Sequence, residues 1–384
     1  MPNADDWVAY AVNTKTGQIL TELPFVDSLS YSYKINDAGG GSVTVPLGGT
    51  GMSKADFEEI SKPWHYSVAI CYKQFVVQAG PVMGESYTDN QGKSQLTFAG
   101  MWKYLSKRLV LPPTWVAGAN PAVSGADTLY ANTTWRNIAI QLVADTTTRN
   151  SLPIVTPTLD AASTVTQQYY GYDMSLVADA LTNVTSLSTN VELEFRPTFS
   201  ATPGYIQWTL RAGSPRLGQI GAPWVWDYGD RGSLTSLDYA TDGSMMEHAD
   251  YARGSGSQYN LAIGTYYDPT LVTAGYPLLE GVNGANTQET NTTTLASYAQ
   301  ATVQTYAYPV ATFSATVRID GTDGTGQLTG SPTIDQVSVG DTGTFCVQRH
   351  RRIPDGNYTL RITGIDSVDY RTAKLTLQST AGVA

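Results

Sequence analysis

The sequence predicts a mainly β protein with an α+β middle, in which two small antiparallel β-barrels flank a helix-containing α+β region. The first indication is composition: 24 Tyr and 8 Trp stand against only 9 Lys in 384 residues. Aromatic side chains favour pleated, half-buried surfaces, whereas long surface helices are usually rich in Lys, Glu, Arg and Ala. The second indication is an alternation of apolar and polar residues near both ends of the chain, which a helical spacing replaces in the middle.

Residues 1–110 are predicted to form the first barrel. Apolar and polar side chains alternate over residues 29–35, which is the period of a strand with one buried face. A glycine-rich turn at 37–41 leads to a return strand over 43–47. Further strands are expected over residues 66–72 and 75–82 and around Leu96 and Phe98, with a turn at 89–92 and a closing helix over 101–108.

Residues 125–215 are predicted to form the α+β domain. Trp135, Ile138, Ala139 and Leu142 follow the spacing of an amphipathic helix behind a Thr133-Thr134 cap region. A second helix is expected behind Asp173, with the apolar positions Met174, Val177, Ala178, Leu181 and Val184. A hairpin across Pro203-Gly204 should then join a strand at 191–195 to one at 205–211.

The remainder divides into two predicted segments. Residues 216–306 should hold connecting strands, an exposed Thr/Asn-rich loop at 283–294 and a helix from Leu295 to Tyr306. Residues 307–384 should form the second barrel, because apolar residues alternate again over 313–319 and 358–362. A chain longer than roughly 250–300 residues is expected to contain more than one domain.

Charge and cysteine content exclude several classes of protein. The net charge of -10 argues against a protein that wraps nucleic acid, because phosphate binding needs clusters of Lys and Arg. The start of the chain lacks the features of a signal peptide and no apolar run approaches ~18 residues, so we expect a soluble protein without a membrane span, made in the cytoplasm. Cys71 and Cys346 lie in alternating runs and are predicted to be buried thiols.

Signals for catalysis, metals and cofactors are weak. His65, His248 and His350 are each isolated, and neither HExxH nor CxxC occurs, so we expect no metal site and no cofactor. The strongest enzymatic alternative is Glu192 with Glu194, because positions i and i+2 of a strand place two carboxylates on one face about 7 Å apart. The simpler interpretation is that both form the polar face opposite Val191, Leu193 and Phe195, so no catalytic residue is predicted.

The one dense basic run is Arg349-His350-Arg351-Arg352, which precedes the turn at 354–357. Such a run at a hairpin tip is most often a solvated surface. In an acidic chain it is also the best candidate for docking an acidic partner surface. Arg349, His350, Arg351 and Arg352 are therefore the predicted partner-docking residues.

Features that carry a family resemblance cover most of the chain. They are Trp7 with the Thr16-Gly17 hairpin, the strand pair within 29–47, Gly80-Pro81-Val82 leading to segment 100–108, and segments 169–181, 212–218, 339–341 and 360–377. This layout resembles the tail hub family of bacteriophages, which includes the N-terminal hub region of siphophage tail-tip proteins, and it is similar to their minor tail proteins.

The resemblance implies a structural protein of the virion, a baseplate hub at the tail tip that closes the distal end of the tail tube and opens for ejection of the genome. It implies a homotrimer in which residues 1–110 and 307–384 are hub barrels, six around one axis. The implied partners are the distal tail protein ring, the tape measure protein and tail fibre or receptor-binding proteins. Genomic DNA would pass without specific binding, which suits an acidic lumen.

A second hypothesis of another class stays open. The chain could be a receptor-binding or carbohydrate-active, glycan-cleaving tail protein, with exposed aromatic residues and Glu192 with Glu194 as its support. An aromatic platform in a concave pocket would favour this hypothesis, and a ring with an acidic bore would favour the hub.

Overall fold

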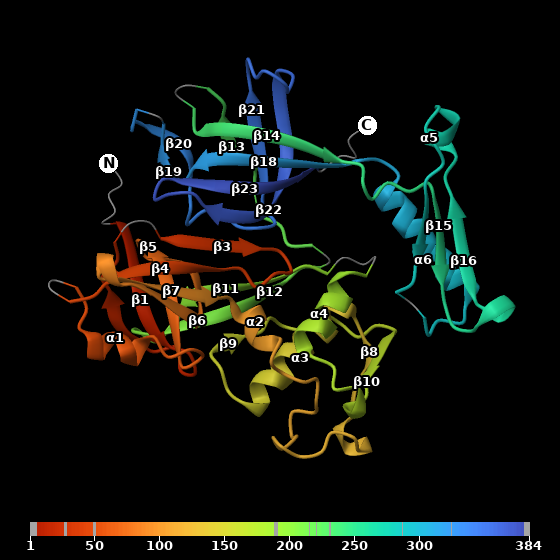
Figure 1. The fold of residues 1–384 in the computed structure, drawn as a ribbon, viewed down its shortest axis with the longest axis horizontal. Coiled ribbons are helices and arrows are strands. Elements are labelled where there is room, and N and C mark those ends of the chain that lie inside the picture. The colour runs from red at the N-terminus through yellow and green to blue at the C-terminus, as the bar shows by residue number, and fades with distance from the viewer. Residues whose placement is uncertain are drawn as a thin grey trace. The chain divides into compact units, whose positions relative to one another are not determined.

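The protein is mainly β, and most of its strands pair antiparallel, as the computed structural model shows (Figure 1). The structure describes residues 6–26, 29–48, 51–187, 191–214, 216–219, 221–229, 232–285, 287–323 and 325–379. Contacts divide the chain into a larger unit, within residues 1–237 and 314–380, and a smaller unit that contains residues 238–313. The predominance of strands over helices confirms the predicted mainly β class.

The longest sheet has the strand order β14-β18-β23-β22-β3-β4-β7-β6-β5-β1-β2. Its N-terminal strands are β1 (Trp7–Asn13), β2 (Ile19–Leu23), β3 (Ser30–Lys34), β4 (Gly40–Pro46), β5 (Tyr66–Tyr72), β6 (Phe75–Thr88) and β7 (Lys93–Ala99). The others are β14 (Leu234–Asp242), β18 (Val310–Arg318), β22 (Gly356–Ser367) and β23 (Thr372–Ser379). Strand β21 (Thr342–Val347) pairs antiparallel with β22 on one edge and parallel with β13 (Trp224–Asp227) on the other. Strands β19 (Asp320–Thr322) and β20 (Leu328–Thr333) form a separate antiparallel pair.

None of the sheets closes into a barrel within the described residues, so the prediction of two small barrels is not confirmed. The reason lies in β3, both of whose edges are paired. One edge bonds β4, with Tyr31 opposite Gly41, and the other bonds β22, with Tyr33 opposite Ile365. We call strands β1 to β7 the N-terminal set and strands β14, β18, β22 and β23 the C-terminal set. The two sets therefore join edge to edge in one sheet.

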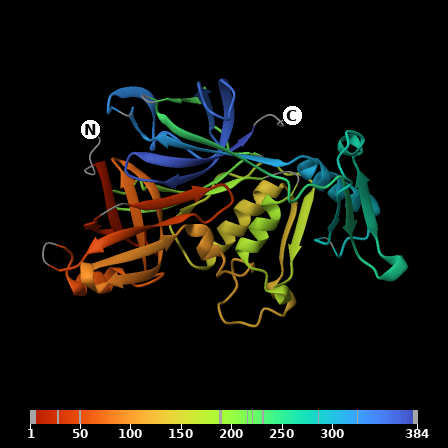
Figure 2. The same cartoon turned by 45° about the horizontal axis from the view of Figure 1, so that its top comes forward.

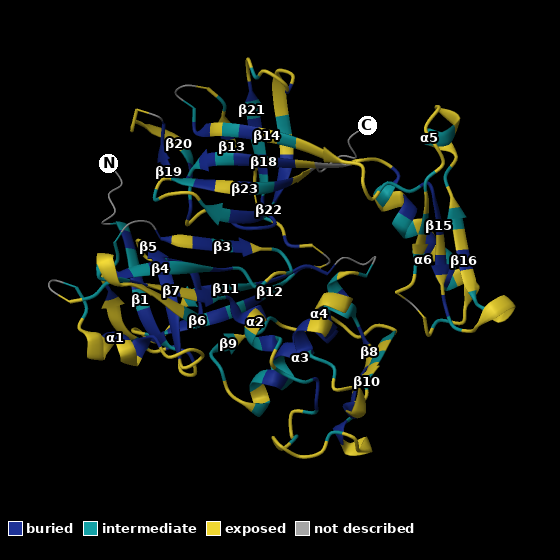
Figure 3. Ribbon diagram, in the orientation of Figure 1, coloured by how far each residue is buried: buried dark blue, intermediate teal, exposed yellow. Residues whose placement is uncertain are grey.

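Within the N-terminal set, the strands predicted from alternation are confirmed. Tyr31 and Tyr33 of β3 are buried as the pattern indicates, and Figure 3 shows β5 buried along its length. Helix α1 (Lys54–Ile60) was not predicted; its first turn is capped by the Ser53 hydroxyl, which accepts a hydrogen bond from the Asp56 N–H. The short helix expected near residue 101 is α2 (Met101–Leu105).

The middle part, which corresponds to the predicted α+β region at 125–215, contains both predicted helices. They are α3 (Trp135–Arg149) and α4 (Val177–Thr185), which contact each other (Figures 1 and 2). Thr134 caps α3 as expected. Helix α4 starts later than predicted, because Met174 takes a left-handed conformation (φ 49°) after the short 3-10 turn η4 (Gly171–Asp173). Around them lie β8 (Thr128–Thr133), β9 (Ile154–Val155), β10 (Val165–Tyr169) and the 3-10 turn η3 (Ser124–Ala126).

The predicted hairpin of the middle part is confirmed as β11 (Leu193–Phe199) paired with β12 (Ile206–Ala212). Pro215, which was quoted for the family resemblance, lies outside the described residues. Strand β11 is bonded at its start to the N-terminal set: Leu193 N–H donates to Asn36 Oδ1 (2.8 Å) and Asn36 N–H donates to Leu193 O (3.0 Å).

The residue before β11, Glu192, ties the middle part to the C-terminal set. Arg361 of β22 holds both oxygens of the Glu192 carboxylate, with 2.8 Å from Nη1 to Oε1. Leu217 N–H donates to the same carboxylate (2.8 Å), and the Arg361 guanidinium donates to Leu217 O (2.6 Å). Glu192 and Arg361 are 169 positions apart and both are buried, so this ion pair joins distant segments of the larger unit.

The smaller unit is a three-stranded sheet covered by one helix. Strand β15 (Ala249–Arg253) lies between β16 (Ile263–Tyr267), antiparallel, and β17 (Glu280–Asn283), parallel. Helix α6 (Thr292–Tyr306), capped by Asn291, confirms the helix predicted from Leu295, and α5 (Thr270–Thr273) is a single turn. A Cβ on Gly264 would stand 2.0 Å from the Ala296 nitrogen, so α6 lies directly on β16 because that residue is glycine.

We expect Arg361→Met to lower the free energy of unfolding by about 3–5 kcal/mol, because it leaves the buried Glu192 carboxylate without its partner. Denaturant titration of the purified protein measures this difference. The control is Lys54→Met, which removes a cation from the exposed Lys54–Glu58 pair and should leave stability unchanged. Similar stabilities for the two variants would contradict the proposed importance of the Glu192–Arg361 pair.

Candidate functional site

The predicted docking residues lie in the loop that joins β21 to β22. Arg349, Arg351 and Arg352 are exposed, whereas His350 is half-buried. Arg349 takes a left-handed conformation (φ 57°), and its N–H donates to the Asp355 carboxylate at 2.7 Å. The loop therefore presents three arginine side chains from a backbone that is locally fixed.

His350 differs from its three neighbours, because its ring stabilises the loop. Its Nδ1 accepts hydrogen bonds from the N–H groups of Arg352 (3.2 Å) and Ile353 (2.9 Å). The ring also packs edge-on against Tyr228, with 5.2 Å between centroids. The His350 ring therefore contributes to the structure of the loop, and the docking role of the four residues stays a prediction.

The carboxylates of the enzymatic alternative are both buried, so their interpretation as an exposed polar face is wrong. Arg361 holds Glu192 from β22, and Arg211 of β12 forms an ion pair with Glu194. The pattern of alternation misled because β11 is covered on both of its faces. Glu192 borders a cavity of about 130 Å³, but its two oxygens already accept bonds from Arg361 and Leu217.

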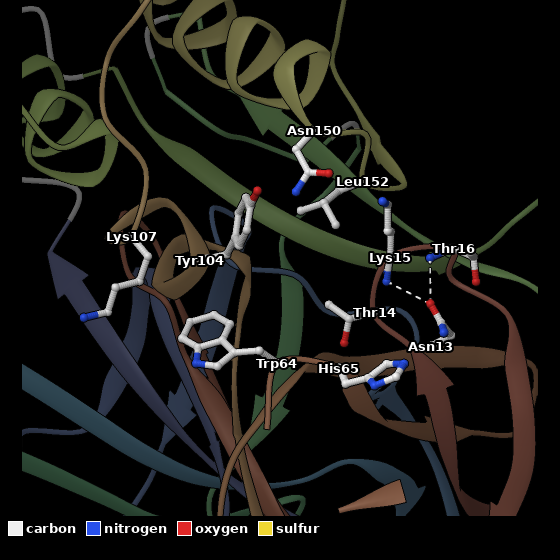
Figure 4. A pocket seen from close by; sticks show the side chains of 10 residues that line it. All are labelled: Asn13, Thr14, Lys15, Thr16, Trp64, His65, Tyr104, Lys107, Asn150 and Leu152. Atoms are coloured by element: carbon white, nitrogen blue, oxygen red, sulfur yellow. Dashed lines mark hydrogen bonds between the residues drawn. The ribbon is translucent and has the colours of Figure 1, made fainter. Parts of the chain in front are cut away.

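A larger pocket, which the sequence analysis did not predict, opens in the larger unit with a volume of about 620 Å³ (Figure 4). We call it the aromatic pocket. It is lined by Asn13, Thr14, Lys15, Thr16, Trp64, His65, Tyr104, Lys107, Asn150 and Leu152. Four separate stretches of sequence supply these residues, which explains why no local motif indicated the pocket.

The aromatic pocket combines ring surfaces with polar groups. Trp64 is 38% exposed and takes a left-handed conformation (φ 64°), which turns the chain just before β5. The Tyr104 hydroxyl is buried without a hydrogen-bond partner. Asn13 accepts bonds from the N–H groups of Lys15 and Thr16 (both 3.0 Å), the dashed lines of Figure 4. Ring faces beside amides and hydroxyls are the chemistry that binds small polar ligands such as sugars.

The two cysteines are free, and Cys71 is buried as predicted, whereas Cys346 is half-buried. Burial raises the pKa of the Cys71 thiol to about 12. Burial, and then Asp227, raise the pKa of Cys346. Both thiols are thus protonated at neutral pH.

Across the described parts of the chain no group of three or more His, Cys, Asp or Glu is placed to hold a metal, and no helix is long and apolar enough to cross a membrane.

We expect His350→Ala to accelerate trypsin cleavage within the loop about thirtyfold, because two hydrogen bonds of about 1 kcal/mol each restrain the backbone next to three arginines. Timed digestion of the folded protein, with the cleavage sites identified by mass spectrometry, measures the rate. His65→Ala, which alters an exposed histidine elsewhere, should not change cleavage at this loop. Equal rates for both variants would show that His350 does not restrain the loop.

Comparisons with known proteins connect this fold to phage tails. No protein-family model matches the chain, and no curated protein matches it. Among solved structures, the 43 kDa tail protein of prophage MuSo2 from Shewanella oneidensis is similar, with a TM-score of 0.59, 12% identity, and 97% of this chain and 98% of that one covered. The tail protein from Neisseria meningitidis MC58 gives the same TM-score and identity, with 97% of each chain covered. The resemblance to phage tail proteins is therefore confirmed as a shared fold along nearly the whole chain.

Proposed function

We propose that the chain is a structural hub protein of a phage tail tip, located in the baseplate of the virion. The observation that carries this proposal is the fold shared with two tail proteins along 97% of the chain. In this role the protein closes the distal end of the tail tube and opens when the genome is ejected. Its partners are the distal tail protein ring, the tape measure protein and tail fibre or receptor-binding proteins.

The proposal includes a homotrimer whose subunits contribute two strand sets each to a ring. Residues 1–110 and 307–384 are the proposed hub domains, with the α+β domain at 125–215 and the connecting segment at 216–306. The strand sets join through β3 and β22, which supports a subunit that is rigid enough to carry both. Few charges and many aromatic residues suit large assembly surfaces, and the net charge of -10 suits a channel that DNA leaves freely.

A reconstruction of intact tails tests this proposal most directly. We expect three copies of the chain around the tail axis, next to the distal tail ring. One copy, six equivalent copies, or a position away from the tail tip would contradict the hub.

We expect replacement of Arg349, Arg351 and Arg352 by Ser to leave the subunit folded and to reduce its incorporation into tails. Guanidinium groups form strong bonds to carboxylates when partly desolvated, and all three side chains are exposed in the free chain. Added salt should deepen the loss, because it screens the remaining contacts. Counting the protein in purified tails measures the effect.

The matched control replaces Lys54, Lys103 and Lys374 by Ser, which removes the same charge from other exposed positions. It should assemble normally. Normal assembly of the arginine variant combined with blocked genome ejection would place the loop on the DNA path and contradict the docking role.

The proposed hub is not an enzyme, because Arg361 and Arg211 neutralise the two carboxylates that could form an acid and base pair. We expect the purified protein to release no soluble fragments from host cell-wall glycan. Cleavage that a folded Glu192→Gln, Glu194→Gln variant no longer performs would overturn this expectation.

A receptor-binding role is the second candidate, and the aromatic pocket favours it. Trp64 and Tyr104 line a concave site together with the amides of Asn13 and Asn150, which fits a bound sugar ring. Both roles are compatible with one fold, because a hub can carry a ligand pocket away from its assembly surfaces.

A further inference from the structure

A second pocket adjoins the aromatic pocket in the larger unit. Its volume is about 590 Å³, and it shares Lys107 and Asn150 with its neighbour. We call it the cationic pocket. Arg108, Leu109 and Arg149 are among the other residues that line it. None of the described side chains that line either pocket is a carboxylate, whereas Lys15, Lys107, Arg108 and Arg149 carry positive charge.

Two half-buried guanidinium groups form the chemical centre of the cationic pocket. Arg149 donates from Nη2 to Leu109 O, and Arg108 donates from Nη2 to Thr146 O over a long 3.4 Å. The Nε atoms of both arginines are buried and have no hydrogen-bond partner. A buried donor without an acceptor costs about 1–3 kcal/mol, so the protein itself leaves the hydrogen-bonding capacity of both guanidinium groups incompletely used.

The charges of the two arginines are also poorly compensated. Burial and then the Arg108 charge lower the pKa of Arg149, while Tyr104 and Asp145 oppose this shift. Asp145 does not line the pocket, and its carboxylate accepts the Tyr130 hydroxyl at 2.8 Å. The guanidinium of Arg108 lies over the Tyr104 ring at 5.6 Å, which fixes its position but supplies no counter-charge. The chemistry of this pocket therefore matches an anionic ligand.

We propose that the cationic pocket binds the phosphate group of a phosphorylated sugar whose ring lies in the adjoining aromatic pocket. A phosphate oxyanion accepts several hydrogen bonds at once and matches the forked geometry of two guanidinium groups. Lys107 borders both pockets and contributes a further positive charge to the phosphate. Trp64 and Tyr104 offer ring surfaces to the sugar.

Nucleic acid fits the same surface less well. Its charged backbone extends far beyond two pockets, and the rest of a chain with net charge -10 opposes a long polyanion. A single sugar phosphate uses the local cations and avoids that repulsion. The inference depends on the two pockets alone and not on the proposed role in a tail.

Calorimetric titration of the full chain with glucose 1-phosphate, glucose and inorganic phosphate tests the proposal. We expect glucose 1-phosphate to bind at least tenfold more tightly than either glucose or inorganic phosphate. Arg149→Gln should weaken glucose 1-phosphate binding by about 10- to 100-fold, since it removes a charged hydrogen-bond donor. Arg149→Lys, which retains the charge but not the fork, should restore only part of the affinity.

Lys107→Gln provides a second test that does not disturb buried contacts, because Lys107 is exposed. It should weaken binding several-fold, whereas Lys103→Gln, an exposed lysine nearby in α2 that lines neither pocket, should not. Unchanged affinity in folded Arg149→Gln or in Lys107→Gln, or no binding of glucose 1-phosphate at all, would overturn the proposal. Tighter binding of a short DNA strand or an acidic peptide at the same residues would overturn the choice of ligand.

Discussion

The buried contacts at the start of β11 are the constraint on which the larger unit depends. Glu192 is held by Arg361 of β22, and the next residue, Leu193, exchanges two hydrogen bonds with Asn36 beside β3. Replacing a buried ion pair by apolar groups is often tolerated, but removing one partner leaves an uncompensated charge. These contacts therefore make the N-terminal set, the middle part and the C-terminal set dependent on one another.

Further contacts extend this constraint along the β11–β12 hairpin. Arg196 donates to the Ser338 hydroxyl and lies over the Phe75 ring at 4.9 Å, so one side chain joins both strand sets. In β12, the Trp208 indole N–H donates to Ala79 O at 3.0 Å. The hairpin is thus fixed on several sides within the larger unit.

The sequence predicted those elements whose two faces differ. Tyr31 and Tyr33 alternate with polar residues because one face of β3 is buried, and α3 shows its helical spacing and its Thr134 cap. Edge pairing could not be predicted in this way, because alternation defines faces but not the neighbouring strand. The pairing of β3 with β22 joins residues more than 300 positions apart, for example Tyr33 and Ile365. Because alternation did not reveal this pairing, two separate barrels were expected, whereas the pairing joins the two strand sets in one sheet.

The candidate site was predictable only in part, for the same reason. The basic run was visible as a cluster of charges, yet the position of the His350 ring depends on packing against Tyr228, which local sequence does not connect to it. Glu192 and Glu194 followed the pattern of an exposed face, but Arg361, far away in the sequence, pairs with Glu192, and Arg211, across the β11–β12 hairpin, pairs with Glu194. The pockets are formed by side chains from separate segments, and only the fold brings them together.

These contacts should make the larger unit one cooperative body. Native-state hydrogen exchange across a denaturant series measures the free energy of opening for each segment of the chain. We expect the amides of β3, β11 and β22 to exchange with the same free energy, equal to that of global unfolding. Loss of protection in β22 and β23 at a much lower free energy, while β3 to β7 stay protected, would contradict it.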